Sequence, residues 1–337
     1  MPTKWLVNWR SIRYEYVVLN KRFLWVTDPW ATLDHAADTT LRLVEEGVRH
    51  GLTNYWADFR TIRWEAGNAT VEAYKVKEVT EGRNKESFLF FKAKTYQASY
   101  FSKIFYRTDP PVDLRYLQPL QLLALGTDPR KTEIVNNPLS LLVLNEKLSG
   151  SRLNLMAPTI AAASWNELKR FGCKHKLTVV KPMHEAQSKG ISLLDWSEKQ
   201  GQKKAKTVLA KVTNNWQIPV VLQIYLKSVK STGETRLWFL DGNLLAVASK
   251  IPKKGHFIIN MDEGAVLRYA TLGSKDLSIS KKIGKYLKEK NVRFAAIDLI
   301  DNKITDFNVT SPGLIVEMEQ VTNQNLAQKI IKALIKI

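Results

Sequence analysis

The chain has 337 residues, 45% of them apolar and 10% aromatic, which is enough to bury large cores in two or three subdomains. It has no run of about eighteen apolar residues, and residues 1–5 lack the apolar segment of a signal peptide. Its single cysteine, Cys173, excludes an internal disulfide and a cysteine-rich metal site. These features predict a cytoplasmic globular protein without a transmembrane segment.

The net charge of +19 is high and unevenly distributed. Residues 201–337 hold 22 basic and 11 acidic side chains, which gives +11 of that total. Such an excess indicates either attraction to a polyanion, such as nucleic acid, an acidic peptide or an anionic membrane, or a solvated basic surface beside a nucleotide site. The second interpretation is the simpler one, because no helix-turn-helix or RNA-binding signature accompanies the charge.

The first part of the chain predicts an extension, residues 1–22, followed by an α/β domain at residues 23–138. Three elements are expected from apolar spacing, caps and prolines: a strand at 23–26, a helix at 38–50 and a rigid turn at 108–113. Asp38 or Thr39 can cap the helix, and Gly51 is a plausible stop. Strands alternating with a helix are typical of an α/β unit.

The middle of the chain, residues 139–222, is predicted to form a separate subdomain. A helix should begin near Ser140 and carry the run Asn145-Glu146-Lys147-Leu148. Apolar strands are expected at residues 176–181 and 220–226.

The last part, residues 223–337, combines a hairpin with two helices. The Asp-Gly pair at 241–242 favours a tight turn between strands at 237–240 and 244–248. Apolar side chains at helical spacing predict a helix over residues 278–290, with lysines on its other side. A last helix is expected from about Asn323.

Two more strands, residues 296–300 and 304–309, flank the turn Asp301-Asn302-Lys303 and carry polar side chains on one face. Asp306 and Asn308 are two residues apart and therefore share a face, and Asp298 joins them if the strands pair. Two carboxylates and an amide oxygen are ligands that Mg²⁺ takes, usually alongside nucleotide phosphates, with Mn²⁺ as an alternative ion. The strands therefore predict a divalent metal site.

Six motifs follow one another along the chain: Arg107-Thr108-Asp109-Pro110-Pro111, Asn145-Glu146-Lys147-Leu148, Val179-Val180-Lys181-Pro182, Gln223-Ile224-Tyr225-Leu226, Gly233-Glu234-Thr235-Arg236 and the run from Asp306 to Pro312. Similar motifs occur in the same order in bacterial glutathione synthetase, a family of the ATP-grasp superfamily, and the chain resembles this family from about residue 23 to 337. The resemblance implies an α/β (α+β) ATP-grasp fold with an N-terminal α/β domain, a central lid domain and a C-terminal metal and nucleotide domain.

The resemblance also implies roles for individual residues. Lys147 and Lys181 would place positive charge on ATP phosphates, and Gln223, Ile224, Tyr225 and Leu226 would form a hinge against the adenine, with backbone groups of Ile224 and Leu226 binding it. Arg236 would stabilise the transferred phosphoryl group or acyl phosphate, and Asn260 matches a second catalytic position. Residues on the substrate side would be Arg107, Asp109, Ser311 and Gly313. Each role has a simpler structural alternative. Lys147 and Lys181 could be ordinary surface lysines, the hinge could be a plain buried strand, and Arg236 could be an arginine on a surface hairpin.

The sequence departs from the family pattern at three places. The glycine-rich lid loop is replaced by residues 184–190, where only Gly190 remains and Glu185 adds a negative charge. Ile258 and Val316 stand where the family has arginines, and Val316 takes the place of the substrate-facing one. These changes put recognition of the usual peptide carboxylate in doubt.

The leading functional prediction is an ATP- and Mg²⁺-dependent carboxylate–amine ligase that acts through an acyl phosphate on a small amino acid or peptide, either a glutathione synthetase or a relative with a changed substrate. One alternative is a weakened homologue that binds a nucleotide or a polyanion and serves a regulatory role. Another is a ligase that modifies an acidic peptide or protein tail. The family resemblance also makes a homo-oligomer an expectation.

Overall fold

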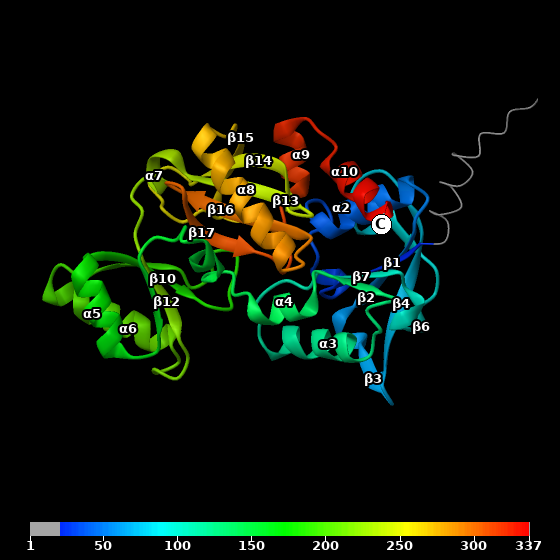
Figure 1. Ribbon diagram of the computed structural model, residues 1–337, viewed down its shortest axis with the longest axis horizontal. Coiled ribbons are helices and arrows are strands. Elements are labelled where there is room, and N and C mark those ends of the chain that lie inside the picture. Colours follow the sequence, from blue (N-terminus) through cyan, green and yellow to red (C-terminus); the bar gives the residue numbers. More distant parts are fainter. Residues whose placement is uncertain (1–20, 337) are drawn as a thin grey trace, which may run out of the picture.

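The computed structural model describes residues 21–336, and these form a mixed α/β architecture with three sheets (Figure 1). The predicted extension, residues 1–22, lies outside the described residues except for Lys21 and Arg22. Each sheet belongs to a consecutive stretch of chain, and the predicted boundaries at residues 138 and 222 stay predictions. No helix within residues 21–336 is both long and apolar enough to cross a membrane.

The N-terminal sheet has eight strands, and its central path runs β3-β4-β2-β1-β7-β8, with β5 and β6 paired to β4. The strands are β1 (Arg22–Thr27), β2 (Thr53–Asp58), β3 (Arg63–Glu65), β4 (Asn68–Val79), β5 (Phe88–Phe90), β6 (Lys94–Gln97), β7 (Lys103–Tyr106) and β8 (Glu133–Val135). Strands β2, β1, β7 and β8 are parallel. Residues just after two of these strands contact the C-terminal part of the chain: Arg107, after β7, contacts Pro312, and Asn136, after β8, contacts Phe294. Open α/β sheets place ligands at these carboxyl ends.

Three helices accompany this sheet: α2 (Thr39–Arg49), α3 (Leu114–Leu125) and α4 (Pro138–Val143). The prediction of a helix over 38–50 is confirmed, because Asp38 accepts the backbone N–H of Leu41 at 2.8 Å and caps α2. The strand predicted at 23–26 is confirmed as part of β1, whose Phe23, Leu24 and Trp25 are fully buried.

The central sheet is antiparallel, with the order β11-β10-β12-β9, and forms the separate lobe on the left of Figure 1. Its elements are β9 (Thr159–Ala162), α5 (Trp165–His175), β10 (Leu177–Pro182), β11 (Ser192–Asp195), α6 (Lys199–Val212) and β12 (Val220–Ile224). Helices α5 and α6 cover one face and share a core with the sheet that includes Trp196 and Leu209. Both predicted strands are confirmed, although β12 ends at Ile224.

The C-terminal sheet has five strands in the order β15-β14-β13-β16-β17. Its elements are α7 (Val229–Thr232), β13 (Glu234–Leu240), β14 (Asn243–Ile251), β15 (Val266–Tyr269), α8 (Ser274–Glu289), β16 (Phe294–Ile300), β17 (Lys303–Asn308), α9 (Ile315–Thr322) and α10 (Leu326–Ile335). Alternate residues of β13 pack in opposite directions: Leu237 shares a core with α8, and Trp238 shares one with α9 and α10.

Short 3₁₀ helices occur at Trp30–Thr32, Phe59–Thr61, Lys85–Ser87, Ala98–Tyr100, Ser149–Leu153 and Met261–Glu263. The predicted hairpins around residues 241–242 and 301–303 are confirmed, and the helix predicted over 278–290 begins four residues earlier, at Ser274. The prediction that the helix near Ser140 carries Asn145-Glu146-Lys147-Leu148 is wrong. Helix α4 ends at Val143 because Leu144 is extended, and the Asn145 side chain then accepts the Lys147 N–H at 3.0 Å, which forms a turn instead.

Candidate functional site

Two adjoining pockets lie where the three sheets meet. The lid pocket is lined mainly by the central and C-terminal sheets, and the N-terminal pocket adds residues of the N-terminal domain. Six residues line both pockets and so define their junction: Ala186, Gln187, Arg236, Lys250, Ile259 and Asn308. All predicted ATP-binding and metal residues line the lid pocket, and all predicted substrate-side residues line the N-terminal pocket.

The three predicted metal ligands lie on one face of the β16–β17 hairpin. Asp298 is directly opposite Asp306 in the register, and Asn308 is opposite Ala296. The Asn308 amide nitrogen donates to the Ala296 carbonyl at 2.9 Å and to Asp298 Oδ2 at 3.2 Å. This arrangement directs the amide hydrogens into the hairpin and leaves the amide oxygen as the group that can act as a ligand.

Asp298 is held by cations from neighbouring strands. Arg236, its cross-strand partner on β13, donates through Nε to Oδ1 at 2.9 Å and through Nη2 to Oδ2 at 2.7 Å. Lys250 on β14 donates to Oδ2 at 2.9 Å and also pairs with Glu234. Burial alone would raise the pKa of Asp298, but Arg236 and Lys250 outweigh this effect and hold that pKa well below its usual range.

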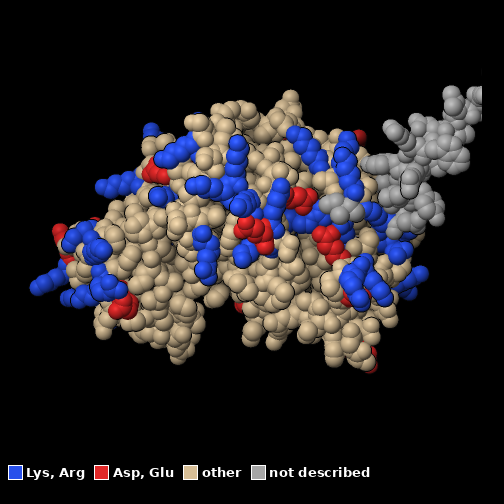
Figure 2. All heavy atoms as spheres, viewed as in Figure 1, with Lys and Arg blue, Asp and Glu red and all other residues tan. Residues whose placement is uncertain are grey.

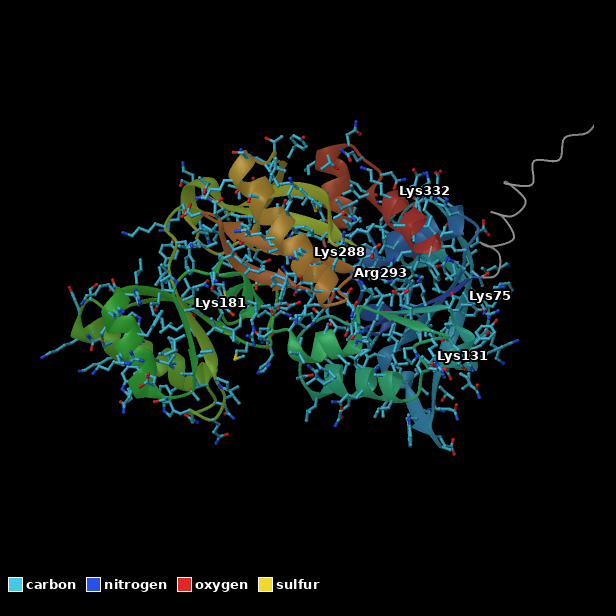
Figure 3. All side chains as sticks on the ribbon, viewed as in Figure 1. Lys75, Lys131, Lys181, Lys288, Arg293 and Lys332 are labelled. Atoms are coloured by element: carbon cyan, nitrogen blue, oxygen red, sulfur yellow. The ribbon has the colours of Figure 1, made fainter. Side chains whose placement is uncertain are left out.

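Asp306 and the backbone of β17 contact the two predicted phosphate-binding lysines. Lys147, in the turn after α4, donates to Asp306 Oδ1 at 2.6 Å. Lys181, on β10, donates to the Thr305 carbonyl at 2.9 Å (labelled in Figure 3). Burial would lower the pKa of both lysines; Asp306 reverses this for Lys147, whereas the pKa of Lys181 stays lowered. Both ammonium groups therefore reach the same end of the hairpin from different sides.

The donor set fits Mg²⁺ by its chemistry. Asp298, Asp306 and Asn308 offer hard oxygen ligands on one face, and this is the kind of partial site that Mg²⁺ completes with waters and phosphates. Within residues 21–336 no group of three or more His, Cys, Asp or Glu side chains could hold a metal, so a site on this hairpin would need the amide of Asn308 as its third ligand. The surrounding cations already neutralise both carboxylates.

The predicted hinge has a feature that depends on one proline. Ile224 N–H donates to the Pro158 carbonyl at 3.1 Å, where β12 continues its antiparallel pairing with β9. A paired residue would return a hydrogen bond to the Ile224 carbonyl, but proline has no N–H. The Ile224 N–H is therefore engaged, and Pro158 returns no hydrogen bond to the Ile224 carbonyl. Nearby, Tyr225 packs edge-on against Phe257, with ring centroids 5.8 Å apart.

The loop that replaces the family's glycine-rich segment covers the junction of the pockets. Gln187 and Ser188 line the lid pocket and adopt φ values of 53° and 61°, which glycine tolerates far better than other residues. Ser188 donates to the Ile259 carbonyl at 3.2 Å, and the His184 carbonyl accepts the Val112 N–H at 3.0 Å. Glu185 does not line either pocket. The loop thus has a glycine-like backbone at two residues that are not glycine, in addition to Gly190.

Arg107 is the central cation of the N-terminal pocket. Its Nε donates to Thr40 at 3.1 Å and its Nη2 to the Pro312 carbonyl at 2.9 Å, while Nη1 is buried without a partner among the described residues. Burial lowers the pKa of Arg107, although Asp38 and Asp109 oppose this effect. Desolvation at the pocket wall and the charge of Asp38 raise the pKa of Asp109 to about 7, although Arg107 lowers it.

The remaining predicted residues lie as follows. Ser311 donates to the Thr108 carbonyl at 3.2 Å, and the Gly313 carbonyl accepts the Trp238 indole N–H at 3.1 Å. Asn260 lines the N-terminal pocket beside the junction and donates to Glu263 at 3.1 Å. Ile258, in place of a family arginine, lines the lid pocket, whereas Val316 is buried in α9 and lines neither.

Sequence reasoning missed two residues of the site. Lys250 contacts Asp298 and lines both pockets, but nothing in the local pattern of β14 marks it as buried. Glu146 accepts the N–H groups of Val309 and Thr310 at 2.8 and 3.1 Å, and so holds the chain that leads from β17 into the N-terminal pocket. Its place beside Lys147 in a motif was the available signal.

Two family models match the chain. The prokaryotic glutathione synthetase N-terminal domain matches residues 22–141, and the prokaryotic glutathione synthetase ATP-grasp domain matches residues 146–323, more than half of the chain. The chain belongs to the prokaryotic glutathione synthetase family. The predicted family is therefore confirmed, and the second match contains the hinge, the metal face and both phosphate-side lysines.

Relatives within this family align with almost the whole chain. A glutathione synthetase from Prochlorococcus marinus is 30% identical over 93% of this chain and 98% of its own length. Those from Synechococcus elongatus and Vibrio vulnificus are 27% and 26% identical, over 93% and 92% of this chain and 98% and 95% of their own lengths.

Solved structures confirm the predicted ATP-grasp fold. The D-cycloserine synthetase DcsG superposes with a TM-score of 0.64 at 16% identity, over 93% of this chain and 99% of its own. The macrocyclase MdnC bound with the precursor peptide MdnA, from Microcystis aeruginosa, gives 0.61 at 12% identity, over 94% and 100%. At such identities the likeness concerns the fold alone.

Proposed function

We propose that this protein is an ATP- and Mg²⁺-dependent carboxylate–amine ligase, in which the lid pocket binds the nucleotide and the N-terminal pocket binds the substrate. The observation that carries the proposal is the cluster at the junction. Four cations, Lys147, Lys181, Arg236 and Lys250, surround the hairpin that bears Asp298, Asp306 and Asn308. This concentration of charge suits the phosphates of a nucleotide and a divalent ion.

The hinge supplies the adenine end of the proposed site. The carbonyl of Ile224 can accept a hydrogen bond from an adenine amino group, and Leu226 offers its backbone beside it. Val179, Ile191 and Ile300 add apolar walls to the lid pocket. An apolar cavity with a few placed polar groups is typical of small-molecule sites.

Asp298, Asp306 and Asn308 would hold Mg²⁺, or Mn²⁺ as the alternative ion. A bound divalent ion would neutralise phosphate charge there. Arg236 and Lys250 pair with Asp298, and Lys147 pairs with Asp306; these ion pairs support the proposal because they hold both carboxylates in place.

The reaction we propose has two displacements. A substrate carboxylate oxygen attacks the terminal phosphorus of ATP and ADP leaves; then an amine nitrogen attacks the carbon of the acyl phosphate, phosphate leaves, and the amine loses a proton. Arg236 and Lys250, at the junction of the pockets, are placed to stabilise charge on the transferred phosphoryl group. We expect the loop at residues 184–190, which lines both pockets through Ala186 and Gln187, to limit the access of water to the junction. Catalysis would then rest mainly on positioning and electrostatics.

Glutathione formation is the first activity to test, because the relatives are glutathione synthetases. ADP formation is measured with Mg²⁺ and ATP, with and without γ-glutamylcysteine plus glycine, and products are analysed by mass spectrometry. Lys181→Met should abolish turnover, whereas Lys169→Met, on the exposed side of α5, should not. Wild-type protein that neither binds nucleotide nor forms ADP with any amino acid or peptide would contradict the ligase proposal.

The strained lid loop favours a second candidate function, a nucleotide-binding protein with little ligase turnover. Gln187 and Ser188 adopt left-handed backbone conformations where a glycine-rich loop would move freely. The same experiment separates the two: nucleotide bound at the lid pocket without ADP formation on any substrate supports the second function.

A further inference from the structure

The N-terminal pocket is acidic within a strongly basic protein. Five carboxylates line it, at Asp34, Asp38, Asp109, Glu146 and Glu317, against three cations, Arg107, Arg236 and Lys250. The chain as a whole carries +19. The net charge of the pocket lining is thus opposite in sign to that of the chain. Such a group of carboxylates is costly to desolvate unless another group compensates their charge.

The cations of this pocket do not neutralise its carboxylates. Arg236 and Lys250 are both paired with Asp298, whose carboxylate belongs to the lid pocket. None of the five carboxylates forms an ion pair with any of residues 21–336. Only Arg107 remains, and although Asp38 and Asp109 act on it electrostatically, neither lies within ion-pair distance of its guanidinium. The excess negative charge is therefore available to a ligand.

Three of these acids already accept hydrogen bonds from the protein, and Asp38 is one of them, since its Oδ1 accepts the Leu41 N–H at 2.8 Å. Asp34 accepts two backbone N–H groups, and Glu146 holds the Val309–Thr310 backbone. Glu317, by contrast, has a buried Oε2 without a partner. Burial raises the pKa of Asp38 although Arg107 opposes this effect, and it raises the pKa of Glu317 although Arg236 opposes it.

Arg107 provides the independent observation that a ligand belongs here. Its side chain is only 6% exposed, it lines the pocket, and its Nη1 lacks a partner although an unpaired buried donor is costly. A guanidinium nitrogen left open is suited to an anionic oxygen, typically a carboxylate. The pocket thus offers one site for a carboxylate and several for a positive charge.

We propose that the substrate of the N-terminal pocket is a cationic amino compound, an amino acid or short peptide whose ammonium group lies among Asp38, Asp109 and Glu317 while Arg107 takes a carboxylate oxygen. The acids lie away from the junction, since none of them lines the lid pocket. The reacting end of the substrate therefore points to Arg236 and Lys250, and its ammonium end to α2 and α9. The orientation of the reacting end rests on the proposed ligase function. The binding of the ammonium and carboxylate groups does not depend on it.

The proposal predicts that the N-terminal pocket binds an amino compound with an extra ammonium group more tightly than one with an extra carboxylate, such as γ-glutamylcysteine. Three probes of similar size separate the charges: L-lysine carries an extra ammonium, L-norleucine is its neutral counterpart, and L-glutamate carries an extra carboxylate. Binding is measured by calorimetry on the full chain, with and without Mg²⁺ and a non-hydrolysable ATP analogue. We expect L-lysine to bind about tenfold more tightly than L-norleucine, and L-glutamate to bind most weakly.

Charge-removing variants test which groups are responsible. Asp38→Asn keeps a residue that can cap α2, and Glu317→Gln is isosteric. Each should reduce the preference for L-lysine about fivefold without changing nucleotide affinity, while Asp128→Asn, outside both pockets, should change neither. Thermal unfolding checks that each variant is folded.

The results have distinct meanings. Equal or tighter binding of L-glutamate, an unchanged lysine preference in the double variant Asp38→Asn/Glu317→Gln, or no binding of any probe would overturn the cationic-substrate proposal. Failure to bind the nucleotide analogue would instead contradict the proposed function. The preference for L-lysine would remain testable in that case, because it is also measured without nucleotide. A lysine preference that both variants weaken would support the assignment.

Discussion

Asp298 is the residue on which the candidate site depends most, because three neighbouring strands contribute groups to it. Arg236, Lys250 and Asn308 all donate to its carboxylate. The side chain is buried, so these contacts operate in a low-dielectric environment where their loss is costly. Its charge therefore affects both stability and ligand binding.

Asp298→Asn should lower the free energy of unfolding by about 2–4 kcal/mol, since two buried cations lose their charged acceptor. Because the folded-state pKa of Asp298 lies below the unfolded value of about 3.9, its contribution is fully present above about pH 5 and is lost progressively as the pH falls past about 3.9 toward the lower folded-state pKa. Chemical denaturation from pH 7 to pH 3 should therefore show a smaller loss of stability in the variant. Asp128→Asn, at an exposed ion pair, is the control. If the free energy of unfolding fell with pH as steeply in the variant as in the wild type, Arg236 and Lys250 would not be holding the pKa of Asp298 below its usual range.

At the residue scale, the sequence predicted that Asp298, Asp306 and Asn308 share a face of the hairpin. It did not predict that Arg236 and Lys250 contact Asp298. Asp306 and Asn308 share a face because of strand geometry, and the turn at Asp301 and Asn302 brings Asp298 opposite Asp306. The contact between Arg236 and Asp298 joins strands separated by 62 positions, and no local pattern gives their register. Lys250 was missed for the same reason, since its burial follows from strand pairing.

At the scale of the elements, the hinge depends on the end of one strand. Strand β12 pairs with β9 as far as Pro158, which has no N–H to return a hydrogen bond to the Ile224 carbonyl. The family motif predicted backbone contacts from Ile224 and Leu226. Because the Ile224 N–H is engaged with Pro158, the adenine contact proposed for Ile224 would use its carbonyl.

Pro158→Ala should weaken nucleotide binding about three- to tenfold, because the restored N–H can pair with the Ile224 carbonyl and compete with adenine. Affinity is measured by calorimetry with a non-hydrolysable ATP analogue. Pro219→Ala, at the exposed start of the same strand, is the matched control. Unchanged affinity in Pro158→Ala would mean that this carbonyl does not contact the base.

The lid loop gives a second prediction for an element. Gln187 adopts φ 53°, a region in which a β-branched residue is strongly disfavoured. Gln187→Val should therefore weaken nucleotide binding about fivefold, whereas Gln187→Gly should leave it equal or tighter. Gln200→Val, on the exposed start of α6, controls for composition. If valine and glycine at position 187 had the same effect, the loop would not close in this conformation.

Local signals predicted several elements well and one badly. The Asp38 cap and the Asp-Gly turn specify their structures within a few residues, and both are confirmed. The run Asn145-Glu146-Lys147-Leu148 has residues compatible with a helix, but its side chains contact distant strands: Glu146 contacts Thr310, and Lys147 contacts Asp306. Such tertiary contacts override helix propensity.

At the scale of the whole molecule, the N-terminal domain is joined to the C-terminal sheet through β8 and β16. Arg293 binds Asp241 at 2.6 and 2.9 Å and Glu133 at 3.1 and 3.2 Å (labelled in Figure 3). The Asn136 side chain donates to the Phe294 and Val309 carbonyls at 2.8 and 2.7 Å. These contacts fix the N-terminal pocket relative to the metal face.

Arg293→Ala should lower the free energy of unfolding by about 1–2 kcal/mol, because two acidic partners lose their shared cation at a partly exposed boundary. Urea unfolding provides the measurement. Arg130→Ala, which removes an exposed pair with Asp128 only, should leave the midpoint unchanged. Equal midpoints for both variants would show that the bridge does not stabilise the domain contact.

The distribution of charge also belongs to this scale. Figure 2 shows Lys and Arg spread over the face that carries α8 and α10, with few acidic side chains among them. The sequence predicted this excess but not its contrast with the acidic N-terminal pocket, because the pocket collects acids from positions 34 to 317. An acidic peptide would be repelled from that pocket, so such a partner would have to bind the outer basic face.

The central claim is that a carboxylate is activated by phosphorylation at the junction of the two pockets. The most direct measurement uses ATP, Mg²⁺ and a mixture of amino acids and γ-glutamylcysteine with ¹⁸O-labelled carboxylates, and analyses the released phosphate by mass spectrometry. An acyl phosphate predicts one ¹⁸O atom in the phosphate for each product formed, and none with Asp298→Asn. ATP consumption that releases phosphate without ¹⁸O would contradict the account, because the oxygen would then have come from unlabelled solvent water and not from the carboxylate.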